Sequence, residues 1–267
     1  MPLAPCKRKT SEARSTPLAQ LECYVMLHFS SVKLVGGDAS AKQADMTVYS
    51  YMLQARESGY DVAAFFCDIE KTCIDDAEKS KQKLQEMAWK QNINTAYSSS
   101  MGRLFDAAAA LLDICHSNSY EGECAIKLEQ AAHMGEQELQ MMSQTEVNDL
   151  QNALSVCSKK VDDIWQADSI KLLVGLYHLK SNYSKEILAY LFHHSVANAI
   201  VELCDKICEE VGINQIVLSG GTFINRILIS EVLKGLKARN MQVYTNEKVP
   251  CGDGCIALGQ IYLATYE

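Results

Sequence analysis

The chain has 267 residues, of which 48% are hydrophobic, and a formal net charge of −8. This length and composition are those of an ordinary globular protein with one large domain or two small ones. Because the charge balance is acidic and basic residues cluster only at Lys7-Arg8-Lys9, we expect no nucleic acid and no membrane as partner, but small molecules and proteins.

Residues 1–31 contain three of the four prolines and are predicted to be a poorly ordered leader. The N-terminus lacks the apolar core of a secretion signal, and no apolar run approaches the length of a membrane span, so we predict a cytoplasmic protein. Residues 32–35 are predicted to form a strand, and residues 41–57 an amphipathic helix that stops at Gly59. The Lys-, Glu- and Gln-rich stretch 67–94 is predicted to be one solvated helix.

A serine run at 98–100 precedes an alanine- and leucine-rich stretch that favours a helix. Asp106 lies within the first two turns of this helix, where its carboxylate can either reach a ligand hydroxyl or stabilise the helix end. A second helix is predicted from Tyr120 to about His133. Residues 135–160 are polar and irregular in period, and they are predicted to be a surface excursion of undefined form.

Two further helices are predicted over residues 168–179 and 184–211, where apolar residues recur at intervals of three and four. The second contains His193 and His194. Neighbouring residues on a helix point about 100° apart, so these two rings are not expected to bind one metal ion. The helix leads directly into the stretch around which the chain is organised.

That stretch is Gln215-Ile-Val-Leu-Ser-Gly-Gly-Thr-Phe-Ile-Asn225, in which a short β-branched run is followed by two glycines and a helical pattern from about Phe223. We interpret it as strand, turn and helix. Gly220 and Gly221 let the backbone approach a ligand closely, and the helix start offers unpaired N–H groups, which together favour a phosphate site. The alternative is that the glycines form only a tight turn.

After this helix, which is predicted to end near Ala238, residues 242–245 are predicted to be a strand and residues 256–266 a final helix, with a Gly-Asp-Gly turn at 252–254 before it. Helices and strands that alternate with short connections indicate an α/β arrangement. Asp253 in this turn is by itself a common turn former.

The eleven cysteines occur singly in a chain too large to need disulfides, so reduced thiols are expected. The pairs Cys204/Cys208 and Cys251/Cys255 have a spacing of four. Without further His or Cys ligands in register, buried apolar thiols are favoured over a zinc site.

Four motifs occur together and in a fixed order. They are Ser99-Ser-Met-Gly-Arg-Leu-Phe-Asp-Ala107, Tyr120-Glu-Gly-Glu-Cys-Ala125, Leu218-Ser-Gly-Gly-Thr-Phe-Ile-Asn225 and Val249-Pro-Cys-Gly-Asp-Gly-Cys-Ile-Ala-Leu-Gly-Gln260. The set resembles the Kae1-like carbamoyltransferase domain of HypF, from about Val32 to the C-terminus. The resemblance is thin over residues 60–95 and 135–180.

The resemblance implies an actin/Hsp70-like (ASKHA, ribonuclease-H-type) fold that is incomplete and has a helix-rich insertion. Residues 32–267 would be the C-terminal portion of that domain, helix-rich over 39–180 and nucleotide-binding over 181–267. It implies a part in hydrogenase maturation, in which the carbamoyl group of carbamoyl-adenylate, made by a YrdC-like domain, is transferred to the C-terminal cysteine of HypE.

The resemblance also implies roles for individual residues. The glycines would contact the nucleotide phosphates, the asparagine would lie near the base, and the two acidic residues would bind the ribose. These nucleotide-binding residues are Gly220, Gly221, Asn225, Asp106 and Glu123. Asp253 matches a metal ligand of the family, so ATP or carbamoyl-adenylate and a divalent metal or iron are the expected cofactors.

Two parts of the family pattern are missing from the sequence. The His-rich metal-binding segment and the first glycine-rich loop have no counterpart in residues 1–31, and one candidate ligand is fewer than the three usual in catalytic metal sites. A fragment, a split gene whose partner chain carries the His-rich half and the YrdC-like domain, and a decayed remnant all fit this pattern. The alternatives to a transferase are a non-catalytic nucleotide-binding or interaction module and, ranked last, an autonomous actin-like ATPase or sugar kinase.

Overall fold

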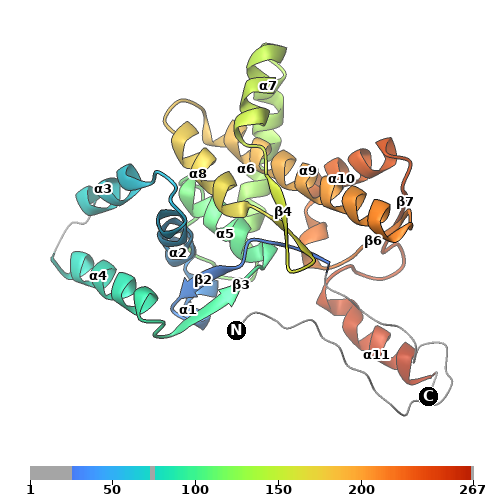
Figure 1. Cartoon of the computed structure of the whole chain (residues 1–267), viewed down its shortest axis with the longest axis horizontal. Coiled ribbons are helices and arrows are strands. Elements are labelled where there is room, and N and C mark those ends of the chain that lie inside the picture. Colours follow the sequence, from blue (N-terminus) through green and yellow to red (C-terminus); the bar gives the residue numbers. More distant parts are fainter. Residues whose placement is uncertain (1–25, 73–75, 266–267) are drawn as a thin grey trace.

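The computed structural model describes residues 26–72 and 76–265, and Figure 1 labels most of its elements. The α-helices are α1 (Asp38–Lys42), α2 (Ala44–Glu57), α3 (Ala63–Thr72), α4 (Asp76–Lys90), α5 (Met101–Leu111), α6 (Glu123–Leu139), α7 (Gln144–Ala153), α8 (Ser169–Leu179), α9 (Lys185–Val211), α10 (Arg226–Ala238) and α11 (Ile256–Ala264). The strands are β1 (Leu27–Phe29), β2 (Val32–Val35), β3 (Thr95–Ser98), β4 (Ser158–Val161), β5 (Ile164–Ala167), β6 (Gln215–Leu218) and β7 (Gln242–Thr245). Short 3-10 helices are η1 (Gly221–Ile224) and η2 (Asp253–Cys255).

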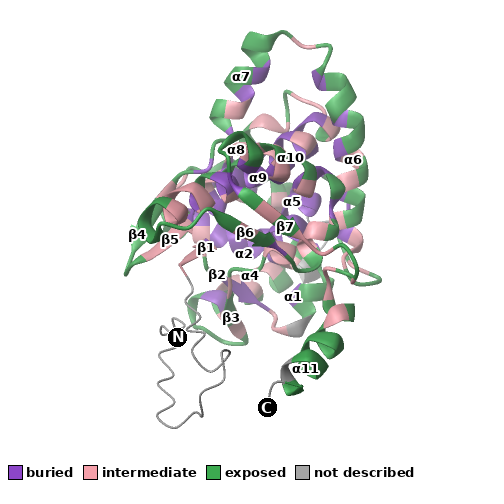
Figure 2. Cartoon of the chain, turned by 90° about the vertical axis from the view of Figure 1, so that its right-hand side faces the viewer, coloured by how far each residue is buried: buried purple, intermediate pink, exposed green. Residues whose placement is uncertain are grey.

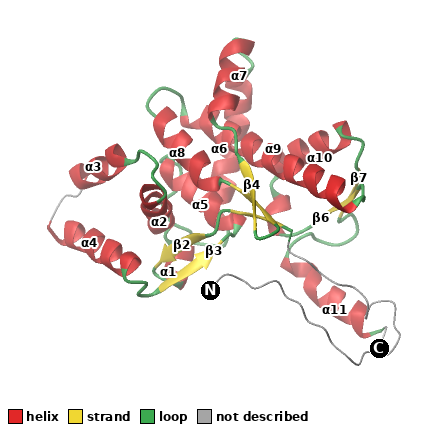
Figure 3. Ribbon diagram, in the orientation of Figure 1, coloured by secondary structure: helices red, strands yellow, loops and turns green. Residues whose placement is uncertain are grey.

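The strands form small sheets among the helices (Figure 3). β2 pairs antiparallel with β3, with Val32 opposite Ser98. β5 pairs in parallel with β1 and antiparallel with β4, and β6 pairs in parallel with β7. The strands predicted at 32–35, at the start of the stretch 215–225 and at 242–245 are confirmed, and the mixture of helices and sheets agrees with an α/β class.

The core lies among the central helices. α9 packs against α6 and α10, and α5 packs against α2, α6 and α8. The alanine run of α5, residues 107–110, is buried throughout, because side chains of one carbon let neighbouring helices approach closely. Gly135 of α6 serves the same purpose, since an added Cβ there would overlap the carbonyl group of Glu186 in α9.

The caps of α8 and α9 follow local sequence signals. The Asp168 side chain accepts a hydrogen bond from the Lys171 N–H before α8, and the Ser184 hydroxyl accepts one from Ile187 before α9. α9 ends at Gly212, whose φ is 73°, the left-handed conformation typical of a helix C-cap. The predicted spans of these two helices are therefore confirmed.

By length and composition, α9 is also a helix of the described residues that could cross a membrane, contrary to the expectation from the sequence. However, 72% of its most apolar window is buried inside the protein. A core helix passes the same test, so the finding is weak evidence for a membrane span.

Several predicted boundaries are wrong. Stretch 67–94 contains the end of α3 and the whole of α4 rather than one helix, and an aspartate at the first position of α4 favours a new helix start. In 135–160, α6 continues to Leu139 and α7 and β4 follow. The signal for α7 is the Ser-x-x-Glu pattern at Ser143, whose hydroxyl accepts a hydrogen bond from the Glu146 N–H.

The two ends of the chain also differ from the predictions. β1 lies inside the predicted leader and pairs with β5, while residues 1–25 lie outside the described residues. The helix predicted from Phe223 begins instead at Arg226, after η1 and the N-cap Asn225. The final helix is described to Ala264.

Candidate functional site

The glycine turn follows β6 directly. Gly220 has a φ of +103°, which L side chains rarely adopt, and its N–H donates to the Cys251 carbonyl oxygen at 2.7 Å. An added Cβ at Gly220 or Gly221 would meet no atom within 4 Å. Among the described residues no acceptor is found for the N–H groups of Gly221 and Thr222, so these two groups are free to bind an anion.

The start of α10 is capped by the protein itself. The Asn225 Oδ1 accepts from the Leu228 N–H at 2.9 Å, and the Glu129 Oε1 of α6 accepts from the Arg226 N–H at 2.7 Å. The expectation that this helix start offers unpaired N–H groups is therefore wrong for these two. Next to the glycines, the N–H groups without a described acceptor are those of Gly221 and Thr222, at the start of η1.

Asn225 is held by a buried histidine of α9. The Asn225 amide nitrogen lies 2.9 Å from His193 Nε2, and His193 Nδ1 lies 2.7 Å from the Ala189 carbonyl oxygen. The carbonyl can only accept, so the proton belongs on Nδ1 and Nε2 accepts from Asn225. Burial lowers the pKa of His193 to about 4, which keeps the ring neutral. Both polar ends of the Asn225 side chain are thus engaged inside the protein.

The two acidic residues predicted to bind ribose are held by one loop. Asn118 donates to Asp106 Oδ1 at 3.1 Å, and Ser119 donates through its N–H and hydroxyl to Glu123 Oε2 at 2.7 and 2.5 Å. Lys127 lies 2.7 Å from Glu123 Oε1. Hydrogen bonds from Lys127 and Ser119 lower the pKa of Glu123 to about 2, so this carboxylate is ionised at neutral pH.

Asp106 is only 2% exposed, and its Oδ2 has no hydrogen-bond partner among the described residues. Arg103 Nη1 lies 2.9 Å from that oxygen but without hydrogen-bond geometry. Burial raises the pKa of Asp106 above its ordinary value. A buried carboxylate oxygen without a donor is unusual, and a ligand hydroxyl would satisfy it. Because the atom is closed to solvent, its neighbours would have to move first.

Contacts between helices connect the acidic pair to the glycine turn. Phe105, next to Asp106, packs edge-on against the His193 ring with centroids 5.2 Å apart, and His193 in turn contacts Asn225. Glu129, which binds the start of α10, lies about 9 Å along α6 from Glu123 at about 1.5 Å per residue. The five residues predicted to bind a nucleotide therefore belong to one connected region.

Asp253 lies beside the same turn, because a Cβ on the preceding Gly252 would be 3.7 Å from the Gly221 Cα. It is exposed. Among residues 26–72 and 76–265, no group of three or more His, Cys, Asp or Glu side chains could hold a metal ion. The described residues therefore do not fit a catalytic metal, which usually needs three protein ligands.

The other histidine of the pair, His194, lies 2.9 Å from Glu231 of α10. Each of the two neighbouring rings therefore has its own partners. Cys204 and Cys208 are partly buried and free, and burial raises the pKa of both thiols, as expected for thiols packed among apolar side chains.

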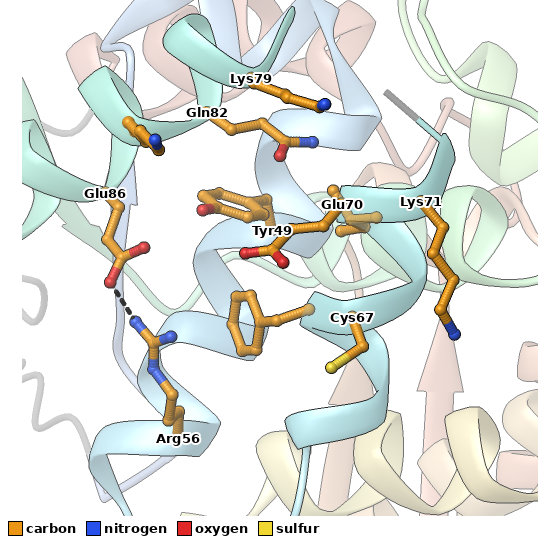
Figure 4. A pocket seen from close by; sticks show the side chains of 11 residues that line it. Tyr49, Arg56, Cys67, Glu70, Lys71, Lys79, Gln82 and Glu86 are labelled. Carbon is orange, nitrogen blue, oxygen red and sulfur yellow. Dashed lines mark hydrogen bonds and ion pairs between the residues drawn. The ribbon is translucent and has the colours of Figure 1, made fainter. Parts of the chain in front are cut away.

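A cavity of about 570 Å³ lies elsewhere, between α2, α3 and α4 (Figure 4). Tyr49 and Phe66 form an aromatic floor, and Arg56 bonds Glu86 across the rim at 2.6 Å. None of the residues predicted to bind nucleotide or metal lines it. We place the candidate site at the glycine turn rather than here, because the turn has free N–H donors and neighbouring carboxylates, whereas the cavity's size alone indicates no ligand.

Several residues that build the candidate site were missed in the sequence. Asn118 and Ser119 follow the pattern of polar residues before a helix start, which could have indicated their role. For His193, the sequence suggests only the question of a metal ligand and gives no sign of its contact with Asn225. Glu129 carries no local signal, because its partner Arg226 is 97 positions away.

Comparison with known proteins identifies relatives of the chain. Residues 19–260 match the family described as the second subdomain of the Kae1-like carbamoyltransferase domain. The chain is 28% identical over 179 residues to the probable carbamoyltransferase HypF of Methanocaldococcus jannaschii, covering 67% of this chain and 21% of the relative. It is 28% identical over 251 residues to carbamoyltransferase HypF2 of Cupriavidus necator, covering 91% of this chain and 30% of the relative.

A solved structure is similar over almost the whole chain. It is full-length HypF in the phosphate- and nucleotide-bound form, with a TM-score of 0.72 and 29% identity, covering 90% of this chain and 34% of that one. The chain therefore spans between about a fifth and a third of these proteins.

Proposed function

Since the chain belongs to the family of Kae1-like carbamoyltransferase domains, as the second subdomain, we propose that it contributes the adenylate-binding part of a HypF-type carbamoyltransferase. Its ligand is ATP or carbamoyl-adenylate. The similar HypF structure is described as phosphate- and nucleotide-bound, which supports a nucleotide as the ligand class. The proposed fold is an actin/Hsp70-like one that is completed by residues outside this chain.

The observation that carries the proposal is the contact path from the acidic pair to the glycine turn. Phe105, His193 and Asn225 form a continuous series of contacts, and Glu129 ties α6 to the start of α10. Segments from three regions of the sequence therefore belong to one connected set of contacts, to which we assign the phosphate and the sugar.

Each part of the region suits one part of an adenylate. The free N–H groups of Gly221 and Thr222 suit phosphate oxygens. Asp106 Oδ2 lacks a donor, and Glu123 is ionised, so both suit ribose hydroxyls. For Asn225 to contact the base, one of its two internal hydrogen bonds would have to be exchanged.

The proposed reaction is acyl transfer to a thiol of a HypE-type acceptor. The thiolate of the acceptor's C-terminal cysteine attacks the carbamoyl carbon, a C–S bond forms, and the bond to the phosphate oxygen breaks. AMP leaves with the electron pair and the carbamoyl group stays on sulfur. In this step, the proposed role of the chain is to hold the AMP half in place through the turn and the two carboxylates.

The metal expected from the resemblance requires further ligands. Asp253 is beside the turn but belongs to no metal-binding group among the described residues, so a divalent metal or iron would need ligands from outside them. The proposed source is a polypeptide carrying the His-rich half and the YrdC-like domain. A cytoplasmic location, where thiols stay reduced, remains part of the proposal.

Nucleotide binding by the purified chain tests the proposal. Titration calorimetry with ATP should give a measurable heat of binding, and Gly221→Val should abolish it, because the branched side chain would fill the open space over the turn. Gly259→Val in α11, which also meets open space, is the matched control and should keep the affinity. Circular dichroism should show unchanged helical content in both variants. No binding by the wild-type chain would refute the nucleotide site.

A second candidate is a nucleotide-binding or interaction module without transfer activity. The absence of a metal-binding group among the described residues favours it. The two candidates differ when the chain is mixed with a protein carrying the His-rich half and a HypE-type acceptor: carbamoylation of the acceptor cysteine, seen by mass spectrometry, supports the transferase. ATP binding without carbamoylation supports the module.

A further inference from the structure

Two buried thiols lie on either side of residues 116–123, the segment that holds the acidic pair. Cys115 follows α5 and is 6% exposed, and Cys124 lies in the first turn of α6 and is completely buried. Cys124 shares the buried face of α6 with Leu128 and Ala132, and Figure 2 shows this helix with buried and exposed sides. Both cysteines are free, and the proposed function uses neither thiol.

The side chains of the two cysteines lie next to each other. The Cys124 Sγ donates to the Cys115 carbonyl oxygen at 3.6 Å, and the Cys115 Sγ donates to the Ser117 carbonyl oxygen at 3.3 Å. Burial, and then the adjacent Cys115 thiol, raise the pKa of the Cys124 thiol. The two thiols are therefore neighbours in space, although nine positions separate them in the sequence.

The segment between the two cysteines positions both acidic residues. The Asn118 Oδ1 accepts from the Cys124 N–H at 2.8 Å, and the Asn118 amide nitrogen donates to Asp106 at 3.1 Å. Ser119 donates to Glu123 through its N–H and its hydroxyl. A change in the distance between the two thiols therefore acts on the groups that hold the two carboxylates.

A positive charge lies beside Cys115. The Lys127 Nζ is 2.7 Å from Glu123 Oε1, and the Glu123 carboxylate, followed by the Cys115 thiol, raises the pKa of Lys127. Reactive cysteines typically lie beside a cation of this kind. Cys115 has such a neighbour, and it also has a second thiol within reach.

The pair Cys204/Cys208 differs, because both of its members lie within α9. Cβ atoms four positions apart on a helix are about 5–6 Å from each other, whereas a disulfide requires about 3.5–4.5 Å. A disulfide there would distort the helix. Cys115 and Cys124 lie on opposite sides of a non-helical connection, which can adjust.

We propose that Cys115 and Cys124 are a redox-sensitive pair that hydrogen peroxide converts to a disulfide, and that the segment holding the acidic pair shifts when this bond forms. The consequence for nucleotide binding rests on the proposed function. Disulfides in cytosolic proteins are usually transient and redox-sensing. The pair is thus reduced in the resting protein and oxidised only when peroxide is present.

Cys115 is the thiol that a small oxidant reaches first, because it is the more exposed of the two and is followed by the exposed residues His116 and Ser117. Its sulfur attacks one peroxide oxygen, the O–O bond breaks, hydroxide leaves and a sulfenic acid forms. The Cys124 sulfur then attacks the Cys115 sulfur, an S–S bond forms and the sulfenic oxygen leaves as water. Two thiols are oxidised, one peroxide is reduced, and the two thiol protons end on the two water molecules.

Formation of the bond removes two hydrogen bonds from the segment. A disulfide has no S–H group, so the carbonyl oxygens of Cys115 and Ser117 lose their donors. The two sulfurs also approach to about 2 Å, which moves the Cys124 N–H relative to Asn118. We expect the hydrogen bonds to the acidic pair to weaken, and the ATP affinity of the oxidised chain to fall about tenfold.

Peroxide treatment of the full chain, followed by alkylation of the remaining thiols and mass spectrometry, tests the pair. Cys115 should be found linked to Cys124. Cys124→Ala should abolish this cross-link, and Cys115→Ala should do so from the other side. Cys204→Ala, in the pair within α9, is the matched control and should keep it. Hydrogen exchange of the Cys124 amide should be about tenfold faster in the oxidised chain, and dithiothreitol should restore the slow rate.

Three results would overturn the proposal: no link between Cys115 and Cys124, a link between Cys204 and Cys208 in its place, or unchanged exchange of the Cys124 amide after oxidation. None of these measurements uses nucleotide. ATP titration of the reduced and oxidised chains then tests the consequence, and equal affinities would contradict it. If the reduced chain does not bind ATP, the proposed function fails, while the cross-link and the exchange rates still decide whether the redox pair exists.

Discussion

Similar apolar side chains are buried in the helical body, which comprises α2, α5, α6, α8 and α9, and exposed in the C-terminal part, which runs from β6 to α11. In the body, Leu128, Leu188 and Leu191 are completely enclosed where α6 and α9 pack together. In the C-terminal part, Leu258 and Ile261 extend into solvent. Leucine occurs in both settings, so the hydrophobicity of a residue alone does not decide whether it joins the core.

The two parts differ in how much apolar surface each buries against its own residues. Burying a leucine side chain contributes about 1.5–3 kcal/mol, and the body gains this from its own residues. The C-terminal part gains it on the inner faces of α10 and the β6–β7 sheet, through side chains such as Leu218, Leu228 and Val232. We therefore expect the body to contribute most of the free energy of folding, whereas α11 and the outer face of β6–β7 contribute little.

The sharpest test of this contrast is one substitution made in both parts. Leu191→Ala should lower the free energy of unfolding by about 2–5 kcal/mol, because it leaves a cavity in a closed core. Leu258→Ala should change it by less than about 0.5 kcal/mol, as exposed substitutions usually do. Urea unfolding followed by circular dichroism measures both. Equal losses would show that α11 is buried in solution and would break the comparison.

Adding a methyl group to one glycine in each part compares how closely the two parts are packed. Gly135→Ala should cost about 3 kcal/mol, at the upper end for overpacking, because the new Cβ overlaps the Glu186 carbonyl and α6 must move away from α9. Gly259→Ala meets nothing and should stabilise α11 by about 0.5–1 kcal/mol through its helix propensity. Thermal unfolding reports the first and hydrogen exchange of α11 the second. A Gly135→Ala protein as stable as wild type would contradict the close approach of α6 and α9.

Local signals account for what the sequence predicted correctly. The span of α9 follows from the serine before it, the glycine after it and the apolar spacing between them. The strand, turn and helix after residue 215 were likewise visible, because glycines interrupt a β-branched run. The error at the helix start arose because Phe223 fits the helical pattern, whereas Asn225 is the residue that caps the helix.

Contacts between distant residues account for what could not be predicted. His193 and Asn225 are 32 positions apart, and no pattern near either residue indicates that they meet. The exposure of α11 was equally invisible, because an apolar run predicts a helix without telling whether a neighbour covers it. The resemblance to the HypF family indicated the candidate site residues but not the capped start of α10.

Asn225→Ala tests how firmly the body holds the C-terminal part. Loss of the cap costs about 1 kcal/mol, and the unpaired Nε2 of buried His193 adds about 1 kcal/mol. Ser143→Ala, which removes the exposed cap of α7, should cost only about 0.5–1 kcal/mol. Urea unfolding compares the two. Equal losses would mean that the His193 contact contributes no stability across the boundary between the two parts.

The smallest predicted effect is the dependence of that contact on pH. His193 stays neutral in the folded protein down to its pKa of about 4, whereas in the unfolded chain histidine takes up a proton near pH 6.5. Acid therefore favours the unfolded chain: the stability from this group is full above about pH 6.5 and is lost as the pH falls toward 4. Between pH 6 and pH 5 the free energy of unfolding should fall by about 1 kcal/mol through this group.

His193→Gln should remove this part of the pH dependence of the free energy of unfolding, while His178→Gln, which removes an exposed ring, should keep it. If both variants kept it, the charge state of His193 would not link α9 to the start of α10, and the cap alone would hold the two parts together.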